Sequence, residues 1–171
     1  MNLFVEGPDS SGKSTLARML STKMKIPYIH PVRAEIGSDI PLWAKSQWET
    51  LTQLHKVTKF NCIFNRSYAS EWVYNYFMKR NSDISYLNDI DEYFSSQDCF
   101  YCYLRPDEHT ILHRMISKKE EFVPIKLESA ECLLKFYDKF YEWTKLPKFM
   151  IDTSRMSEEE CVEKILKFVS K

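Results

Sequence analysis

A glycine-containing segment near the amino terminus has residue types that suit polyphosphate binding. The predicted strand Asn2–Glu6 is followed by Gly7, Pro8, Asp9, Ser10, Ser11, Gly12, Lys13, Ser14 and Thr15, and then by a predicted helix. Backbone N–H groups must surround a polyphosphate, and glycine lets the backbone come close to it. The start of the helix adds the positive end of its dipole. This GxxxxGKS pattern between a strand and a helix predicts a Walker A phosphate loop, or P-loop, in which residues Gly7–Thr15 bind ATP.

Two side chains of this loop have specific predicted tasks. Lys13 carries a mobile positive charge that reaches the β- and γ-phosphates of ATP. Ser14 offers its hydroxyl to Mg²⁺, and Thr15 supports it from the next position. The chain contains three glycines, whereas average composition predicts about twelve. Because Gly7 and Gly12 both fall in this loop, the loop is where the backbone most needs glycine.

A second group of polar residues follows the predicted strand Asn61–Asn65. Arg66 stands directly after this strand, and a guanidinium there can hold a phosphate with two parallel hydrogen bonds. Ser70 and Tyr74 recur at helical spacing on the predicted helix Tyr68–Arg80. The alternative is that Arg66 caps the strand and that the aromatic helix packs into the core.

The elements that must position these residues alternate between strand and helix. The predicted strands are Asn2–Glu6, Tyr28–His30, Asn61–Asn65, Cys99–Leu104 and Lys148–Ile151. The predicted helices are Lys13–Lys25, Pro41–Lys59, Tyr68–Arg80, Ile84–Ser95, Pro106–Lys118, Lys126–Thr144 and a last one that a capping box at Ser157 opens. This alternation predicts one α/β domain over residues 1–171, and together with the P-loop motif it predicts the three-layer P-loop NTPase sandwich. It has a five-stranded, mostly parallel sheet with helices on both faces. Functional groups then gather where the strands end.

Composition excludes several other classes of protein. Basic and acidic residues both number 24, and no basic block occurs, which argues against a general nucleic-acid binder. No apolar run approaches the ~18 residues of a membrane span, and the acidic N-terminus is not a signal peptide. The cysteines are expected to be buried free thiols in a reducing compartment, which predicts a cytoplasmic protein; they are Cys62, Cys99, Cys102, Cys132 and Cys161. Because the chain has neither an NKxD-like motif nor a strand ending in a motor-type aspartate, a small-molecule kinase is the economical interpretation.

Longer segments resemble a known family. The stretch FVEGPDSSGKST resembles the phosphate loop of thymidylate kinases, including its aspartate, Asp9. The stretch NRSYASEWVYN resembles their DRYxxSxxAYQ segment, in register at Arg66, Ser70 and Tyr74, and it is equally similar to the short thymidylate kinase-like proteins of phages. Residues Tyr101–Trp143 are similar to the strand, helix, lid and final helix that deoxynucleoside kinases share with them.

This resemblance implies phosphoryl transfer from Mg·ATP to a nucleoside monophosphate, or alternatively to a deoxynucleoside or a modified nucleotide in DNA. It implies that Arg66 binds the acceptor's phosphate or the transferring group, that Asp9 touches the acceptor's sugar, and that Ser70 and Tyr74 line its pocket. Arg114 leads into a short lid, about residues 117–126, whose cations close over the phosphates. The lid lysines fit a solvated turn equally well. A homodimer through Tyr68–Phe77 is left open.

The sequence departs from the family at two positions. Asn65 stands where the family has an acidic residue, and its amide can still hold a metal-bound water but lacks the charge. His30, before Pro31, stands where deoxynucleoside kinases have a glutamate base; it is either a base near neutral pH or an ordinary polar cap. The missing acid leaves a third function open, an ATP-binding module with little or no catalysis.

Recognition of the acceptor's base is assigned to the predicted helix Pro41–Lys59. Trp43 offers a ring for stacking, and Gln47 offers an amide for the edge of the base. Trp48 lies on the same helix. Each tryptophan is also suited to the core, and an exposed glutamine is an ordinary finding.

Overall fold

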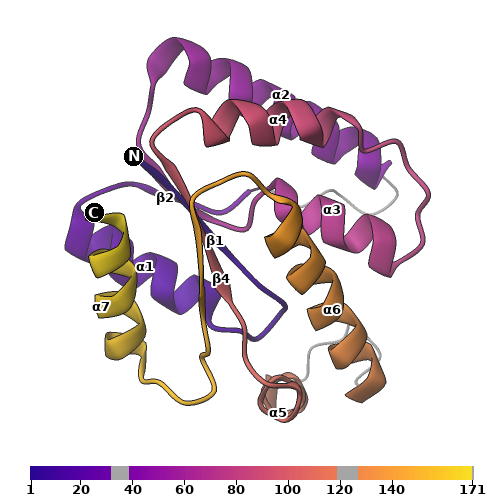
Figure 1. Ribbon diagram of the computed structural model, residues 1–171, viewed down its shortest axis with the longest axis vertical. Helices are drawn as coiled ribbons and strands as arrows, with labels where there is room; N and C mark the ends of the chain where they lie inside the picture. Colours follow the sequence, from indigo (N-terminus) through magenta and orange to yellow (C-terminus); the bar gives the residue numbers. More distant parts are fainter. Residues whose placement is uncertain (32–38, 119–126, 171) are drawn as a thin grey trace.

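The computed structural model describes residues 1–31, 39–118 and 127–170, and it contains a five-stranded sheet (Figure 1). The order of the strands is β2-β3-β1-β4-β5, and all neighbouring pairs are parallel. The strands are β1 (Asn2–Glu6), β2 (Tyr28–Ile29), β3 (Cys62–Asn65), β4 (Cys99–Leu104) and β5 (Lys148–Ile151). Because β1 lies in the centre, the phosphate loop that follows it emerges at the middle of the carboxyl edge.

Helices cover both faces of this sheet, as the α/β prediction requires. Figure 1 shows α1 (Lys13–Met24) and α7 (Glu158–Val169) on one side. The other side carries α2 (Ile40–Thr58), α3 (Tyr68–Phe77), α4 (Tyr86–Ser95) and α6 (Leu127–Trp143), while α5 (Glu108–Lys118) packs on α6. The predicted capping box is present, because Ser157 Oγ accepts from Glu160 N and Glu160 accepts from Ser157 N.

Alternating side chains of the strands build two cores. Phe4 of β1 packs with Trp48 and Tyr68 under the helices of one face, whereas Leu3 and Val5 pack with residues of α1 and α7 on the other. Strand β4 alternates in the same way, since Cys99 belongs to the first core and Cys102 to the second. A strand that is apolar along its whole length therefore reflects burial on both faces.

The predicted boundaries of β1, β4 and β5 are correct to the residue, and the other differences lie at element ends. Helix α3 ends at Phe77 instead of Arg80, because Lys79 and Asn81 take positive φ values of 52° and 53°. Strand β2 ends one residue before His30. Residues 119–126, most of the predicted lid, lie outside the described residues.

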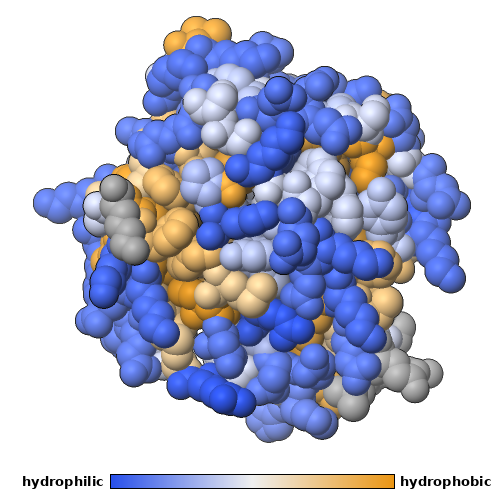
Figure 2. Space-filling model, in the orientation of Figure 1, coloured by the Kyte–Doolittle hydropathy of each residue, from blue (hydrophilic) through white to orange (hydrophobic). Residues whose placement is uncertain are grey.

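The prediction of free thiols is confirmed, but the prediction that all of them are buried is wrong for Cys132. Cys132 lies on α6, where its neighbours Leu133 and Leu134 face the core and the cysteine faces outward. None of the described helices is both long and apolar enough to cross a membrane. Figure 2 shows hydrophilic residues over most of one face, with apolar surface gathered mainly beside α7.

A buried histidine joins α2 to the amino edge of the sheet. Asn2 Nδ2 donates to Nε2 of His55 at 2.9 Å, and Nδ1 of His55 lies 2.8 Å from the hydroxyl of Tyr93. One accepting and one donating nitrogen describe a neutral imidazole. Burial, followed by the charge of Lys59, lowers the pKa of His55 below its ordinary 6.5.

We expect His55 to weaken the fold in mild acid. Because the folded state favours the neutral ring, its contribution is complete above pH 6.5 and is lost as the pH falls below that value. In His55→Gln, thermal unfolding midpoints should therefore fall less than in the unchanged protein between about pH 7.5 and about pH 5.5. His113→Gln, at an exposed histidine of α5, is the control and should keep the original pH dependence. Equal pH dependence in all three proteins would contradict this expectation.

Candidate active site

The predicted phosphate loop lies between β1 and α1 and depends on left-handed backbone. Gly7 has a φ of 145°, Ser10 of 62° and Gly12 of 100°. Gly12 is the N-cap of α1, where it leaves the first turn of the helix without a side-chain cap. Ser11 N donates to Pro8 O and tightens the turn. The backbone thus has the form that sequence reasoning predicted for an anion-binding loop.

Gly7 is fixed by a second constraint besides its φ. A Cβ atom at this position would lie 2.4 Å from the backbone oxygen of Leu104 in β4 and 2.9 Å from Ser11 Oγ. Strand β4 therefore approaches the loop so closely that no side chain fits between them. At Gly12, by contrast, a Cβ would meet no atom within 4 Å and would project into open space.

We expect Gly7→Ala to disrupt the loop. The added methyl meets backbone that cannot move without shifting β4, and crowding of this kind costs roughly 1–3 kcal/mol in addition to the strain at positive φ. The denaturation midpoint should fall, and ATP affinity should fall by at least about tenfold. Gly12→Ala is the matched variant, and because it meets no atom it should lose less stability. Equal losses for the two variants would show that the approach of β4 does not matter.

Lys13 lies over the start of its own loop. Its Nζ atom donates to the carbonyl oxygens of Gly7 at 2.7 Å and of Pro8 at 2.5 Å. The side chain is 6% exposed; its charge helps to lower the pKa of Asp9 and offsets part of the rise that burial causes in the pKa of Glu6. A positive charge at this depth interacts more strongly with an anion than one in bulk water.

Asp9, Arg66 and Tyr74 come together from three elements. The guanidinium of Arg66 donates to Asp9 Oδ1 in an ion pair, and the hydroxyl of Tyr74 donates to Asp9 Oδ2 at 3.3 Å. Burial acts to raise the pKa of Asp9, but the charges of Lys13 and Arg66 outweigh it and lower the pKa. Asp9 in turn raises the pKa of Arg66 against the effect of burial. Both groups are therefore charged, and a cation from β3 faces the phosphate loop.

The backbone of Arg66 is itself unusual. Its φ is 82°, which an arginine adopts only at an energetic cost of about 1–3 kcal/mol. Its N–H donates to Val5 O at 3.1 Å, so β1 holds this turn directly. The ladder between β1 and β3 places Val5 opposite Asn65. The structure thus keeps a strained backbone at the residue that faces the loop.

Ser14 and Asn65 are neighbours, as the prediction of a shared metal site requires. Asn65 Nδ2 donates to Ser14 Oγ at 2.9 Å and to the hydroxyl of Tyr28 at 2.9 Å. Asn65 Oδ1 is buried and has no hydrogen-bond partner among the described residues, so an oxygen acceptor is left over beside the serine. Hydroxyl and amide oxygens are ligands that suit Mg²⁺ and its bound water. The described part of the chain contains no group of three histidine, cysteine, aspartate or glutamate side chains that could hold a metal alone.

Glu6 is a residue of this site that sequence reasoning missed. It is the last residue of β1 and is completely buried, and its carboxylate accepts hydrogen bonds from Gly7, Ser67 and Ser70. Ser70, predicted to line the acceptor pocket, thus directs its hydroxyl to Glu6 at 3.1 Å. The available signal was a carboxylate that follows the apolar residues Leu3, Phe4 and Val5 of the central strand, directly before the loop.

Arg114 lies apart from the ion pair but is linked to the phosphate loop. Its guanidinium donates to Thr153 O at 2.8 Å and to Thr153 Oγ1 at 3.3 Å. Thr153 Oγ1 donates to Ser11 O at 3.2 Å. The segment that follows β5 therefore connects α5 with the loop.

The remaining predicted residues follow β2 or lie on α2. His30 is exposed, and its one hydrogen-bond partner in the described part of the chain is Pro31 O at 2.8 Å. Trp43 and Gln47 are half-buried in the first turns of α2. That end of α2 points to the carboxyl edge, because His55 near the other end contacts Asn2. Trp48 is 3% exposed and belongs to the core.

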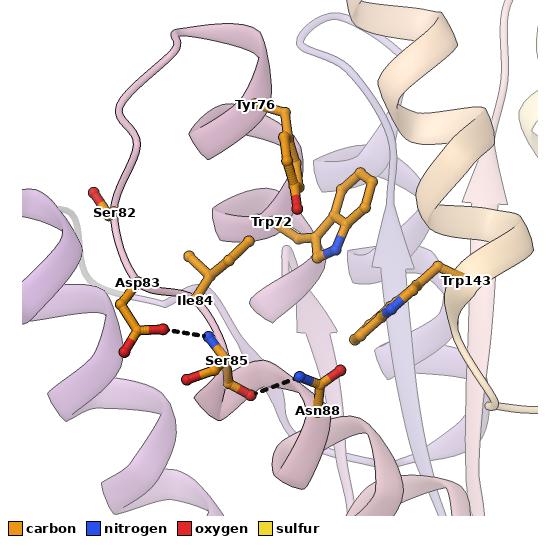
Figure 3. A pocket seen from close by; sticks show the side chains of 8 residues that line it. All are labelled: Trp72, Tyr76, Ser82, Asp83, Ile84, Ser85, Asn88 and Trp143. Atoms are coloured by element: carbon orange, nitrogen blue, oxygen red, sulfur yellow. Dashed lines mark hydrogen bonds between the residues drawn. The ribbon is translucent and has the colours of Figure 1, made fainter.

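A surface pocket of about 290 Å³ lies elsewhere, between α3, the start of α4 and the end of α6 (Figure 3). Trp72 and Trp143 lie side by side there, with ring centroids 6.1 Å apart. The aromatic side chains of α3 pack against α6 within the chain, through Trp72–Phe140, Tyr76–Phe136 and Phe77–Phe136. The pocket includes no residue of the phosphate loop and no partner of Arg66, so it is separate from the candidate active site.

Comparison with known proteins identifies similar solved structures. No protein-family model matches the sequence, and no curated protein matches it. The YorR protein of Bacillus subtilis, solved with phosphorylated GDP, is 23% identical over 99% of this chain and 96% of its own, with a TM-score of 0.81. Deoxyadenosine kinase of M. mycoides, solved with dATP, is 21% identical over 100% of both chains, with a TM-score of 0.66. Thymidylate kinase of Candida albicans is 18% identical over 99% of this chain and 90% of its own, with a TM-score of 0.67. This chain therefore has the P-loop kinase fold, with the phosphate loop after the central strand of its sheet.

Proposed function

We propose that this protein is a kinase that transfers a phosphoryl group from Mg·ATP to a deoxynucleoside or nucleoside monophosphate, of thymidylate-kinase type. The observation that carries the proposal is the ion pair between Arg66, at the end of β3, and Asp9, in the middle of the phosphate loop. A guanidinium held beside the loop can bind a second phosphate group, that of an acceptor. A module that only binds a nucleotide has no use for such a group. The similarity in fold to thymidylate and deoxyadenosine kinases supports the same reaction class.

The residues divide between the two substrates. In this proposal, Lys13 and the loop backbone bind the phosphates of ATP, and Arg66 binds the phosphate of the acceptor. Asp9 is proposed to contact the acceptor's sugar, and Tyr74, which donates to Asp9, is proposed to line the acceptor's pocket. Arg66 and Lys13 stabilise the charge that develops on the transferring group, and no general base is needed because the acceptor's phosphate is already ionised.

Ser14 and Asn65 are the residues proposed to hold Mg²⁺, the serine directly and the asparagine through water. The ion supplies positive charge that offsets the negative charge of the phosphates. Because Asn65 is neutral, this chain places one negative charge fewer beside the ion than an acidic residue would. Trp43 and Gln47 are proposed to meet the acceptor's base from the first turns of α2.

The direct test is a panel of acceptors with Mg·ATP, read as release of ADP. The panel contains deoxynucleoside and ribonucleoside monophosphates, including guanine nucleotides because the YorR structure holds phosphorylated GDP. It also contains the free nucleosides and a DNA oligonucleotide, and Lys13→Ala is the control for contaminating kinases. Robust turnover of a monophosphate supports the proposal.

Two other outcomes would replace it. Turnover of nucleosides but not monophosphates, lost in His30→Ala, would identify a nucleoside kinase with His30 as its base. ATP binding without transfer to any member of the panel would identify a nucleotide-binding module.

A further inference from the structure

The carboxylate of Glu6 is enclosed by hydrogen-bond donors that all lie near Arg66 or at the start of the phosphate loop. Its Oε1 atom accepts from the backbone N–H groups of Ser67 and Ser70 and from both of their hydroxyls. Its Oε2 atom accepts from Gly7 N at 3.2 Å and from the hydroxyl of Ser70 at 3.1 Å. One side chain therefore links the end of β1 to the turn between β3 and α3.

A buried carboxylate needs a reason, because removing its charge from water is costly. Burial raises the pKa of Glu6 above its ordinary value, and the charges of Arg66 and Lys13 and the bonds from Ser67 offset only part of that rise. A residue that served only the packing of β1 would be apolar, like Leu3, Phe4 and Val5 before it. The charge and the acceptor atoms of Glu6 therefore have a role other than packing in the core.

The backbone at Arg66, directly before the donor Ser67, is what Glu6 stabilises. Arg66 has a φ of 82°, and it is held on one side by its own N–H to Val5 O and on the other by Ser67 N to Glu6. A strained residue persists only where its surroundings fix it from several directions. Consecutive residues of β1, Val5 and Glu6, therefore clamp the turn that presents the guanidinium to Asp9.

We propose that Glu6 is a positioning residue that holds the turn at Arg66 in its strained conformation and so aims the guanidinium across the phosphate loop at the acceptor's phosphate. The effect of Glu6 on turnover rests on the proposed function, whereas its effect on the conformation of the turn does not. In Glu6→Gln an amide replaces one accepting oxygen and the negative charge is lost. In Glu6→Asp the charge remains, but the carboxylate is one methylene too short to reach both Gly7 and Ser67.

The matched control is Asp91→Asn. Asp91 is 2% exposed and accepts from the hydroxyl of Tyr68, the hydroxyl of Thr144 and the backbone of Lys145, far from the phosphate loop along the chain. It is thus a second buried carboxylate with several donors, and it contacts the same segment through the side chain of Tyr68, but it accepts from neither Ser67 nor Ser70. Any effect that comes from a general loss of stability should appear in the variants of both Glu6 and Asp91.

Two readouts are needed. Hydrogen–deuterium exchange measures how fast the backbone N–H groups of residues 66–70 exchange with solvent. Steady-state kinetics measures the KM for the acceptor and the KM for ATP separately. Both Glu6 variants should speed exchange in residues 66–70. They should also lower the acceptor's kcat/KM by about 10- to 100-fold, as loss of a hydrogen bond to a charged group does. The KM for ATP should change less than threefold. Asp91→Asn, which disturbs this segment only at the side chain of Tyr68, should speed exchange in residues 66–70 less than either Glu6 variant and leave the acceptor's KM unchanged.

Unchanged exchange in both Glu6 variants would overturn the proposal, and so would an equal rise of the acceptor's KM in Asp91→Asn. If the unchanged protein phosphorylates no acceptor, the proposed function fails, but exchange in residues 66–70 still decides whether Glu6 holds the turn. In that case, faster exchange in the Glu6 variants than in Asp91→Asn supports the role of Glu6 in holding the turn, and equally fast exchange in Asp91→Asn rejects it.

Discussion

Lys13→Ala is expected to lower kcat by about 10³-fold, with the fold retained. The ammonium group of Lys13 is nearly buried and lies at the mouth of the phosphate loop, next to the carbonyl oxygens of Gly7 and Pro8. Phosphoryl transfer spreads negative charge over the oxygens of the transferring group, and a fixed positive charge in a dry site stabilises that charge most. Alanine leaves the loop's backbone N–H groups in place, so ATP binding should weaken less than turnover.

The measurement is steady-state turnover with saturating Mg·ATP, together with a thermal unfolding midpoint. Lys23→Ala is the matched control, because Lys23 is an exposed lysine on the same helix and should leave turnover unchanged. A Lys13→Ala protein that keeps turnover within tenfold of the original would contradict a catalytic role for this loop. A variant that has lost its folded structure is recognised by the unfolding measurement and is replaced by Lys13→Met, which keeps the apolar stem of the side chain.

The elements of the fold could be predicted from the sequence where local pattern decides them. Strand β4 is apolar along its length and is buried on both faces, so its boundaries are clear in the sequence. The predicted end of β2 is one residue too late, because a two-residue edge strand has little pattern of its own. The order β2-β3-β1-β4-β5 is carried by contacts between distant segments, and no local periodicity encodes it.

The same distinction explains the site. The phosphate loop was predictable because its conformation is local: Gly7 and Gly12 take the positive φ values that the motif needs. The proximity of Ser14 and Asn65 followed from the rule that parallel strands end at one edge. The carboxylate of Glu6 is visible in the sequence directly before the loop, but its partners Ser67 and Ser70 lie more than sixty residues away, so the sequence does not show what it holds. Trp43 and Trp48 are the same residue type on the same helix. Trp48 enters the core because its side of α2 faces Phe4 and Tyr68, and that is a property of packing.

The largest effect on the acceptor is expected from Arg66→Met. Arg66 is the cation that reaches the phosphate loop from outside it, through its ion pair with Asp9. Methionine fills a similar volume but removes the charge and the two-pronged hydrogen bonding. The acceptor's kcat/KM should fall by about 10²- to 10³-fold, whereas the affinity for ATP, which depends on the loop and Lys13, should change less than threefold. Kinetics with each substrate varied in turn measures both quantities.

A second arginine makes this a sharp comparison. Arg105 also follows a parallel strand, β4, and its guanidinium pairs with Asp138 at 2.8 and 3.0 Å, but its partner belongs to α6. Arg105→Met breaks an ion pair of the same kind at the same edge of the sheet, so it should cost stability without a selective loss for the acceptor. If both variants lowered the acceptor's kcat/KM equally, the effect would come from loosening the edge of the sheet. If only Arg66→Met did so, the guanidinium beside Asp9 is the group that meets the acceptor, and Asp9 holds it in place until a phosphate replaces the carboxylate as its partner.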